Sequence, residues 1–155
     1  MPNNDNKIVE LLEKSVKKAS LSIEKEMNFR PFLMILDIHG VVKTIENKAI
    51  SNEESYELLQ DSIRGRVMDN NISVALLVTS DMMPSKYIKD NIPVPAIRIH
   101  LEDKDQLNKK ISARFIYVPY TLHRIKNSTD IFLKVGIPIP VGFPAEYLTT
   151  HLYNA

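Results

Sequence analysis

Four polar residues, in two short pairs, have the types and spacing that could support chemistry. Asp37 and His39 are two residues apart, and so are His100 and Glu102. Because side chains of an extended strand alternate between its two faces, each pair would project from a single face. If the two strands were level neighbours, two carboxylates and two imidazoles would converge in a set that suits Zn, Mn or Fe(II).

A second interpretation of the same four residues needs no site. Asp37 and His39 would end a strand at its turn, and His100 and Glu102 would lie in water on an open sheet face. Two short pairs without a dedicated spacing motif are more often of this second kind. We therefore keep the four residues as candidate ligand-binding residues, assign no catalytic residue, leave the metal undefined and expect no cofactor.

Other kinds of catalytic site find little support. The chain has no cysteine, which excludes disulfides, thiolate nucleophiles and zinc-thiolate sites. Ser80-Asp81 with His39 or His100 could make a serine hydrolase triad, but no Gly-x-Ser-x-Gly elbow presents the serine. The four glycines do not form a phosphate-binding loop. The sequence thus leans away from an enzyme.

Length and charge define the broad class. The chain has 155 residues, the size of one domain, with 44% apolar and 25% charged residues, which is typical of a globular protein. The net charge of +1 provides no strong field toward nucleic acid. A loose basic zone with tyrosines nearby could still form a single-stranded nucleic acid platform, an interpretation that the near-zero net charge disfavours. The zone comprises Lys109, Lys110, Arg114, His123, Arg124 and Lys126, with Tyr117 and Tyr120.

Location is inferred from missing signals. The first residues, MPNNDN, contain no apolar signal core. No apolar run approaches the roughly 18 residues that span a bilayer. We expect a cytoplasmic protein without a membrane span.

Apolar periodicity predicts two helices and five strands. Stripes at three- and four-residue spacing predict helices over residues 6–27 and 52–69, the second opened by the capping box Ser51-Asn-Glu-Glu54. The segment 32–38 is apolar on both faces, which indicates an interior strand covered twice. The predicted strands are 32–38, 41–45, 73–82, 95–102 and 112–118.

The strand 95–102 shows the clearest alternation. Its apolar members are expected to face the core and its polar members to face water, so that one face of the sheet is partly open. The inward set is Ile97, Ile99 and Leu101, and the outward set is Arg98, His100 and Glu102.

The chain after residue 118 has a different character. Pro138 and Pro140 alternate with apolar residues and cannot supply amide donors to a central sheet position. We expect residues 119–155 to form an extended segment that packs on the core or on a partner. The fold class is therefore α+β: a single domain over 1–155, with an α-β-β-α-β-β-β core over 6–118. Its central antiparallel sheet has about five strands, with helices packed on it.

Two resemblances accompany this pattern. The element order over residues 6–118 resembles the Roadblock and profilin-like domains, in which helices cover a central antiparallel sheet and many members are dimeric scaffolds. Short motifs, Ala96-Ile-Arg-Ile-His-Leu-Glu102 and Val118-Pro-Tyr120, are similar to a family of small uncharacterised bacterial proteins. That family has an acidic residue where this chain has Pro95, and it implies no activity.

The leading functional hypothesis is a non-catalytic protein-interaction or scaffold domain that self-associates as a homodimer. The first alternative is a small-molecule- or metal-binding protein or enzyme that uses Asp37, His39, His100 and Glu102. The second is an immunity-type protein that neutralises a protein partner. The sequence does not separate the second alternative from the leading hypothesis.

Overall fold

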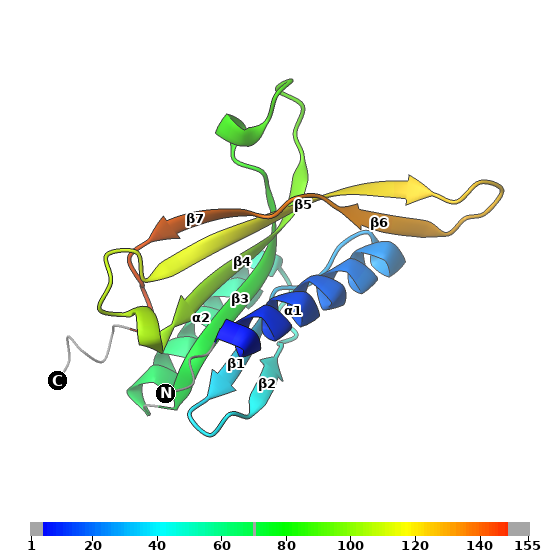
Figure 1. Ribbon diagram of the computed structural model, residues 1–155. Coiled ribbons are helices and arrows are strands. Elements are labelled where there is room, and N and C mark those ends of the chain that lie inside the picture. The colour runs from blue at the N-terminus through cyan, green and yellow to red at the C-terminus, as the bar shows by residue number, and fades with distance from the viewer. Residues whose placement is uncertain (1–4, 70, 149–155) are drawn as a thin grey trace.

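A computed structural model describes residues 5–69 and 71–148, so the end of the predicted extension, residues 149–155, lies outside the described residues. The chain is α+β with an antiparallel sheet, and the predicted order α-β-β-α-β-β-β is confirmed (Figure 1). Two further strands follow that core in the chain. The helices are α1 (Asp5–Glu26) and α2 (Asn52–Met68), and the strands are β1 (Phe32–Asp37), β2 (Val42–Ile45), β3 (Ile72–Met82), β4 (Pro95–Asp103), β5 (Ala113–Arg124), β6 (Ile131–Val135) and β7 (Ile139–Phe143).

All strand pairings among these residues are antiparallel, in the order β2-β1-β3-β4-β5-β6, with β7 also on β5. The sheet is therefore wider than the five strands expected from the sequence. The two added strands come from the predicted extension, which packs along the edge of its own sheet.

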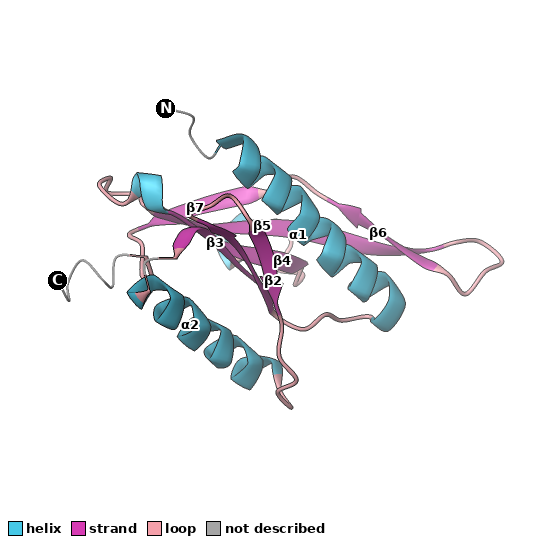
Figure 2. Ribbon diagram, turned by 90° about the horizontal axis from the view of Figure 1, so that it is seen from below, coloured by secondary structure: helices cyan, strands magenta, loops and turns pink. Residues whose placement is uncertain are grey.

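The two helices cover opposite faces of the sheet (Figure 2). On one face, α1 packs its buried stripe on alternate residues of β1, β3 and β4, such as Met34, Leu76 and Ile99. On the other face, α2 packs on the intervening residues, such as Ile35 and Leu77. Every residue of β1 is buried, which confirms the expected doubly covered strand. Neither helix is long and apolar enough to cross a membrane.

Local signals account for the start of α2 and for the first hairpin. The Ser51 hydroxyl accepts the Glu54 amide at 3.1 Å, so the predicted capping box supplies its N-cap bond. Gly40 closes the turn between β1 and β2 with a φ of 82°, a conformation that costs a residue with a Cβ about 1–2 kcal/mol.

The strand β5 extends six residues beyond the predicted 112–118. Its first part lies between β4 and β7, and its last part, Tyr120–Arg124, pairs with β6 and with no other described strand. Pro119 is tolerated inside this strand because its nitrogen points away from β4, and its carbonyl accepts the Gly136 amide at 2.7 Å. The β5–β6 hairpin projects from the body in Figure 1, and we call residues 119–135 the arm.

Two glycines with open space around the position of a Cβ make a matched pair. We expect Gly40→Ala to lower the free energy of unfolding by about 1–2 kcal/mol, because alanine disfavours positive φ. Gly65 lies inside α2, and nothing lies within 4 Å of the position that its Cβ would take. Gly65→Ala should therefore raise the free energy of unfolding by about 0.5–1 kcal/mol. Urea unfolding monitored by circular dichroism measures both changes. Equal effects of the same sign would contradict the assigned backbone conformations.

Candidate functional site

The C-terminal end of β4 carries a buried carboxylate that holds a distant part of the chain. The Oε2 of Glu102 lies 2.6 Å from Nε2 of His100. Both side chains are buried, with 0% and 2% exposure respectively. The same carboxylate accepts the backbone amides of Glu146, Tyr147 and Leu148 at 2.9–3.3 Å. We call this set of contacts the Glu102 latch, because it fixes the segment that follows β7.

The segment held by the latch completes the core on the α2 side. Tyr147 and Leu148 are buried in the same cluster as Leu59 and Ile63 of α2. The Tyr147 ring lies 4.8 Å from the His100 ring, and its hydroxyl accepts a hydrogen bond from Gln60. Burial raises the pKa of Tyr147 to about 12, so the hydroxyl stays protonated at neutral pH.

The hydrogen bonds decide the charge state of Glu102. Burial alone would raise the pKa of the Glu102 carboxyl. Hydrogen bonds from His100 and from the amides of Leu148 and Glu146 outweigh burial and lower this pKa below its ordinary value of 4.5. Glu102 is therefore ionised at neutral pH, and the carboxylate that accepts these bonds is a structural group.

The expectation that β4 presents one face to water was wrong. The apolar and the polar residues of β4 lie on opposite faces of the strand, as predicted. Both of these faces, however, are covered by other parts of the protein. His100 and Glu102 lie beneath the latched segment, and Arg98 is half-buried. The error has a physical cause: polar residues of a strand face water unless another segment satisfies them, and here that segment is some 45 residues away in the chain.

The other candidate pair lies in a turn. Asp37, at the end of β1, accepts the backbone amides of His39 at 2.8 Å and Val41 at 2.9 Å, and His39 is exposed. The hydrogen bond from the Val41 amide lowers the pKa of Asp37, and the bond from the His39 amide adds to this effect. Together they outweigh partial burial, which alone would raise the pKa. This is the second interpretation made from the sequence, a strand that ends at its turn.

The structure does not bring the two pairs together. The strand β3 lies between β1 and β4 in the sheet. Within residues 5–69 and 71–148, no three His, Cys, Asp or Glu side chains are arranged to hold a metal ion. Ser80 also lies on the α1 side of the sheet, with Val78, whereas His100 faces the α2 side, so a triad of these residues is not assembled.

A polar cleft beside α2 involves a residue that the sequence did not mark as a candidate. Arg98 donates to Asp81 at 2.9 Å, and its guanidinium lies 5.5 Å from the Tyr56 ring centroid and 4.8 Å from that of Phe115. The cleft has a volume of about 570 Å³ and also contains Thr79. Nothing in the spacing of these residues predicted the cluster, because it joins α2, β3, β4 and β5.

A larger hollow lies on the opposite face, between α1 and the β5–β7 edge. Its volume is about 820 Å³. Leu12 and Val16 of α1 form one wall, Leu133 and Pro138 belong to the other, and Ile116 contributes to the floor. Glu13, Lys17 and Ser20 stand on the α1 side of this groove. We call it the α1 groove; its lining is mainly apolar, as in sites that bury apolar partners or ligands.

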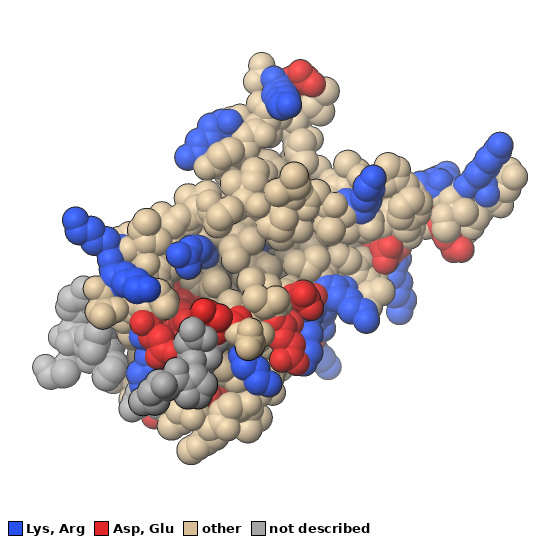
Figure 3. Space-filling view, in the orientation of Figure 1, with Lys and Arg blue, Asp and Glu red and all other residues tan. Residues whose placement is uncertain are grey.

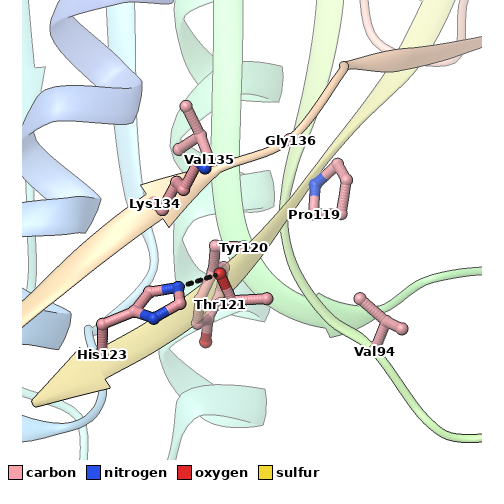
Figure 4. A pocket seen from close by; sticks show the side chains of 8 residues that line it. All are labelled: Val94, Pro119, Tyr120, Thr121, His123, Lys134, Val135 and Gly136. Atoms are coloured by element: carbon pink, nitrogen blue, oxygen red, sulfur yellow. Dashed lines mark hydrogen bonds between the residues drawn. The ribbon is translucent and has the colours of Figure 1, made fainter.

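A smaller hollow, the arm hollow, lies at the base of the arm (Figure 4). Its volume is about 290 Å³. Val94, from the segment that leads into β4, faces Pro119 and Thr121 of β5 across it, and Lys134 of β6 lies beside it (Figure 4). The Thr121 hydroxyl and Nε2 of His123 are 2.8 Å apart, which orients this face of the arm.

The basic zone of the sequence divides between two places. Lys109 and Lys110 precede β5, whereas Arg124 and Lys126 lie at and beyond its far end. A strand of twelve residues spans about 40 Å, so these charges do not form one patch. The second group belongs to the arm.

Comparisons with known proteins return no relative: no protein-family model, no curated protein and no solved structure matches the chain. Functional inference therefore rests on the geometry of these surfaces.

The latch predicts a large stability effect of one substitution. We expect Glu102→Gln to lower the free energy of unfolding by about 2–4 kcal/mol, because one amide oxygen replaces a carboxylate that serves three amides and an imidazole. Glu57→Gln, at an exposed position of α2, is the matched control and should change stability by less than about 0.5 kcal/mol. Urea titration measures both; equal effects would show that the latch is not a major source of stability.

The lowered pKa of Glu102 sets the direction of its pH dependence. Its folded pKa lies below the ordinary 4.5, so its stabilisation is present above about pH 4.5 and is lost as the pH falls through the folded value. We expect the wild type to lose more stability than Glu102→Gln between about pH 5 and pH 3. Parallel urea titrations at the two pH values test this difference. Identical losses would mean that Glu102 contributes nothing to acid unfolding.

Proposed function

We propose that the protein is a non-catalytic interaction domain that self-associates as a dimer through the face formed by α1 and the α1 groove. The exposed side of α1 carries Val9, Glu13, Lys17 and Leu21 at four-residue spacing, which places them in one row along the helix. Val9 and Leu21 are 54% and 57% exposed.

This row is complementary to itself, and that observation carries the proposal. In an antiparallel pairing about a two-fold axis near residue 15, Glu13 of one copy faces Lys17 of the other, and Val9 faces Leu21. Lys7, Glu10, Lys14 and Lys18 of α1 form ion pairs, whereas Glu13 and Lys17 form none with the described residues, so their charges can face a second copy. Two-fold interfaces require such self-complementary patches.

The groove adds apolar area to the same face. Leu12 and Val16 lie beside the row, and Leu133 and Pro138 line the facing side of the groove. A second copy that covers this face would remove those side chains from water, at about 25 cal/mol for each Å² of apolar surface. A dimeric scaffold in the cytoplasm agrees with the expectation from the sequence.

Light scattering with a charge-exchange series tests the dimer. We expect the wild type to have a dimer mass at tens of micromolar, and Glu13→Lys or Lys17→Glu alone to weaken association several-fold, because each places like charges opposite one another. The double variant Glu13→Lys with Lys17→Glu restores opposite charges and should restore the dimer.

Both positions lie on the water-facing side of α1, so folding should be unchanged, which circular dichroism checks. A wild-type monomer at tens of micromolar would refute self-association. If the charge variants dimerise as the wild type does, the interface lies elsewhere on the protein.

A second candidate function is the binding of an apolar small molecule in the same α1 groove, favoured by its volume of about 820 Å³. This groove takes the place of the ligand site that the sequence suggested at Asp37, His39, His100 and Glu102, because His100 and Glu102 are buried under the latch. A groove that takes a small ligand should bind an apolar fluorescent dye with one molecule for each chain, and Val16→Asp should abolish that binding.

A further inference from the structure

The arm has a backbone edge that no strand of the described residues covers. Pairing of β5 with β4 ends at Pro119, five residues before β5 ends. The Pro119 carbonyl and the Ile125 amide bond toward the β6 side, so the odd-numbered residues of this stretch pair with β6. The amides and carbonyls of Tyr120, Leu122 and Arg124 therefore point to the opposite edge. This edge is about 17 Å long.

The other sheet edges are protected. Along β7, Pro140 removes an amide donor, and Pro138 precedes the strand. On the outer side of β6, the Leu133 amide donates to Glu24 of α1 at 2.8 Å. The edge strand β2 has only four residues and carries Lys43. Among the described residues, the β5 stretch Tyr120–Arg124 is the longest edge without such a device.

A side-chain hollow accompanies the open edge. The arm hollow, about 290 Å³, is lined by Val94, Pro119, Thr121 and Lys134. Its lining is mainly apolar, and Figure 4 shows Val94 across from Thr121. Strand addition commonly combines main-chain bonds to an edge with a pocket for alternate side chains of the added strand.

The charge around the edge indicates the chemistry of the added strand. The arm and the neighbouring segment 83–94 contain five basic and two acidic residues, whereas the rest of the chain has fifteen basic and seventeen acidic ones. Figure 3 shows Lys and Arg on the projecting arm and on the upright segment, each with some acidic surface beside them, and the largest acidic area on the body. The basic residues are Lys86, Lys89, Arg124, Lys126 and Lys134.

We propose that the β5 edge of the arm binds an extended, acidic segment of a partner protein as an added strand. Its backbone would pair with Leu122 and with Tyr120 or Arg124, and an apolar side chain would enter the arm hollow. Its carboxylates would lie near Arg124 and Lys134. This inference goes beyond self-association, because the arm hollow and the α1 row lie on different surfaces and each stands without the other.

The experiment is selection of random octapeptides displayed on phage against the full-length protein. We expect enrichment of sequences that alternate apolar and acidic residues, with micromolar affinity by fluorescence anisotropy. Lys134→Glu should weaken a selected peptide at least fivefold, and Lys109→Glu, at the other end of β5, is the matched control that should not. No enrichment, or enrichment of basic peptides, would overturn the proposal.

Backbone pairing needs its own readout. Leu122→Pro removes an edge-facing amide without removing a β5–β6 hydrogen bond, so it should abolish binding of the selected peptide. Leu122→Ala loses the same packing against the core but keeps the amide, and should bind. If Leu122→Pro does not fold, amide exchange of the wild type decides: the Leu122 amide must gain protection with peptide. Binding without that protection would overturn strand addition.

Discussion

The Glu102 carboxylate is the interaction on which this structure depends. It is buried and charged, a state that is costly unless hydrogen bonds replace the lost water. The imidazole of His100 and three consecutive backbone amides provide that replacement. Removing either side leaves the other unsatisfied: without the segment 146–148 the carboxylate loses its donors, and without the carboxylate three amides lose their acceptor. The segment 146–148 and the C-terminal end of β4 thus stabilise each other.

The segment held by the latch also helps to cover a sheet that is wider than one helix. Six adjacent strands make a sheet about 24 Å across, measured between its outer strands, whereas one helix covers about 10 Å of it. On the α2 face, the latched residues Tyr147 and Leu148 extend the cover that α2 begins. On the α1 face no described segment does the same, and the α1 groove lies where that cover is missing. The groove is therefore a consequence of covering a wide sheet with a single helix on that side.

Sequence patterns predicted the parts of this fold that depend on local preference. The double burial of β1, the capping box of α2 and the two faces of β4 followed from periodicity and hydrogen-bonding side chains. What covers the polar face of β4 did not follow, because Glu102 and its amide donors are joined only by tertiary folding. Asp37 and His39 matched the simpler of their two interpretations. The continuation of β5 through Pro119 was missed because a proline fits inside a strand where no neighbour needs its amide, here opposite Gly136 in the break between β6 and β7, and sequence does not reveal that position.

The edges of the sheet differ in how well they are protected against pairing with another strand. Proline in β7, the Glu24 carboxylate on β6 and the short β2 strand each limit pairing at an edge. The β5 edge of the arm has none of these, although an open edge exposes a protein to aggregation. The positive charge of the arm limits pairing between identical arms, because two copies would bring like charges together. In our proposal, an edge that is open to pairing but repels its own kind favours an oppositely charged strand, and this difference separates the arm from the row on α1.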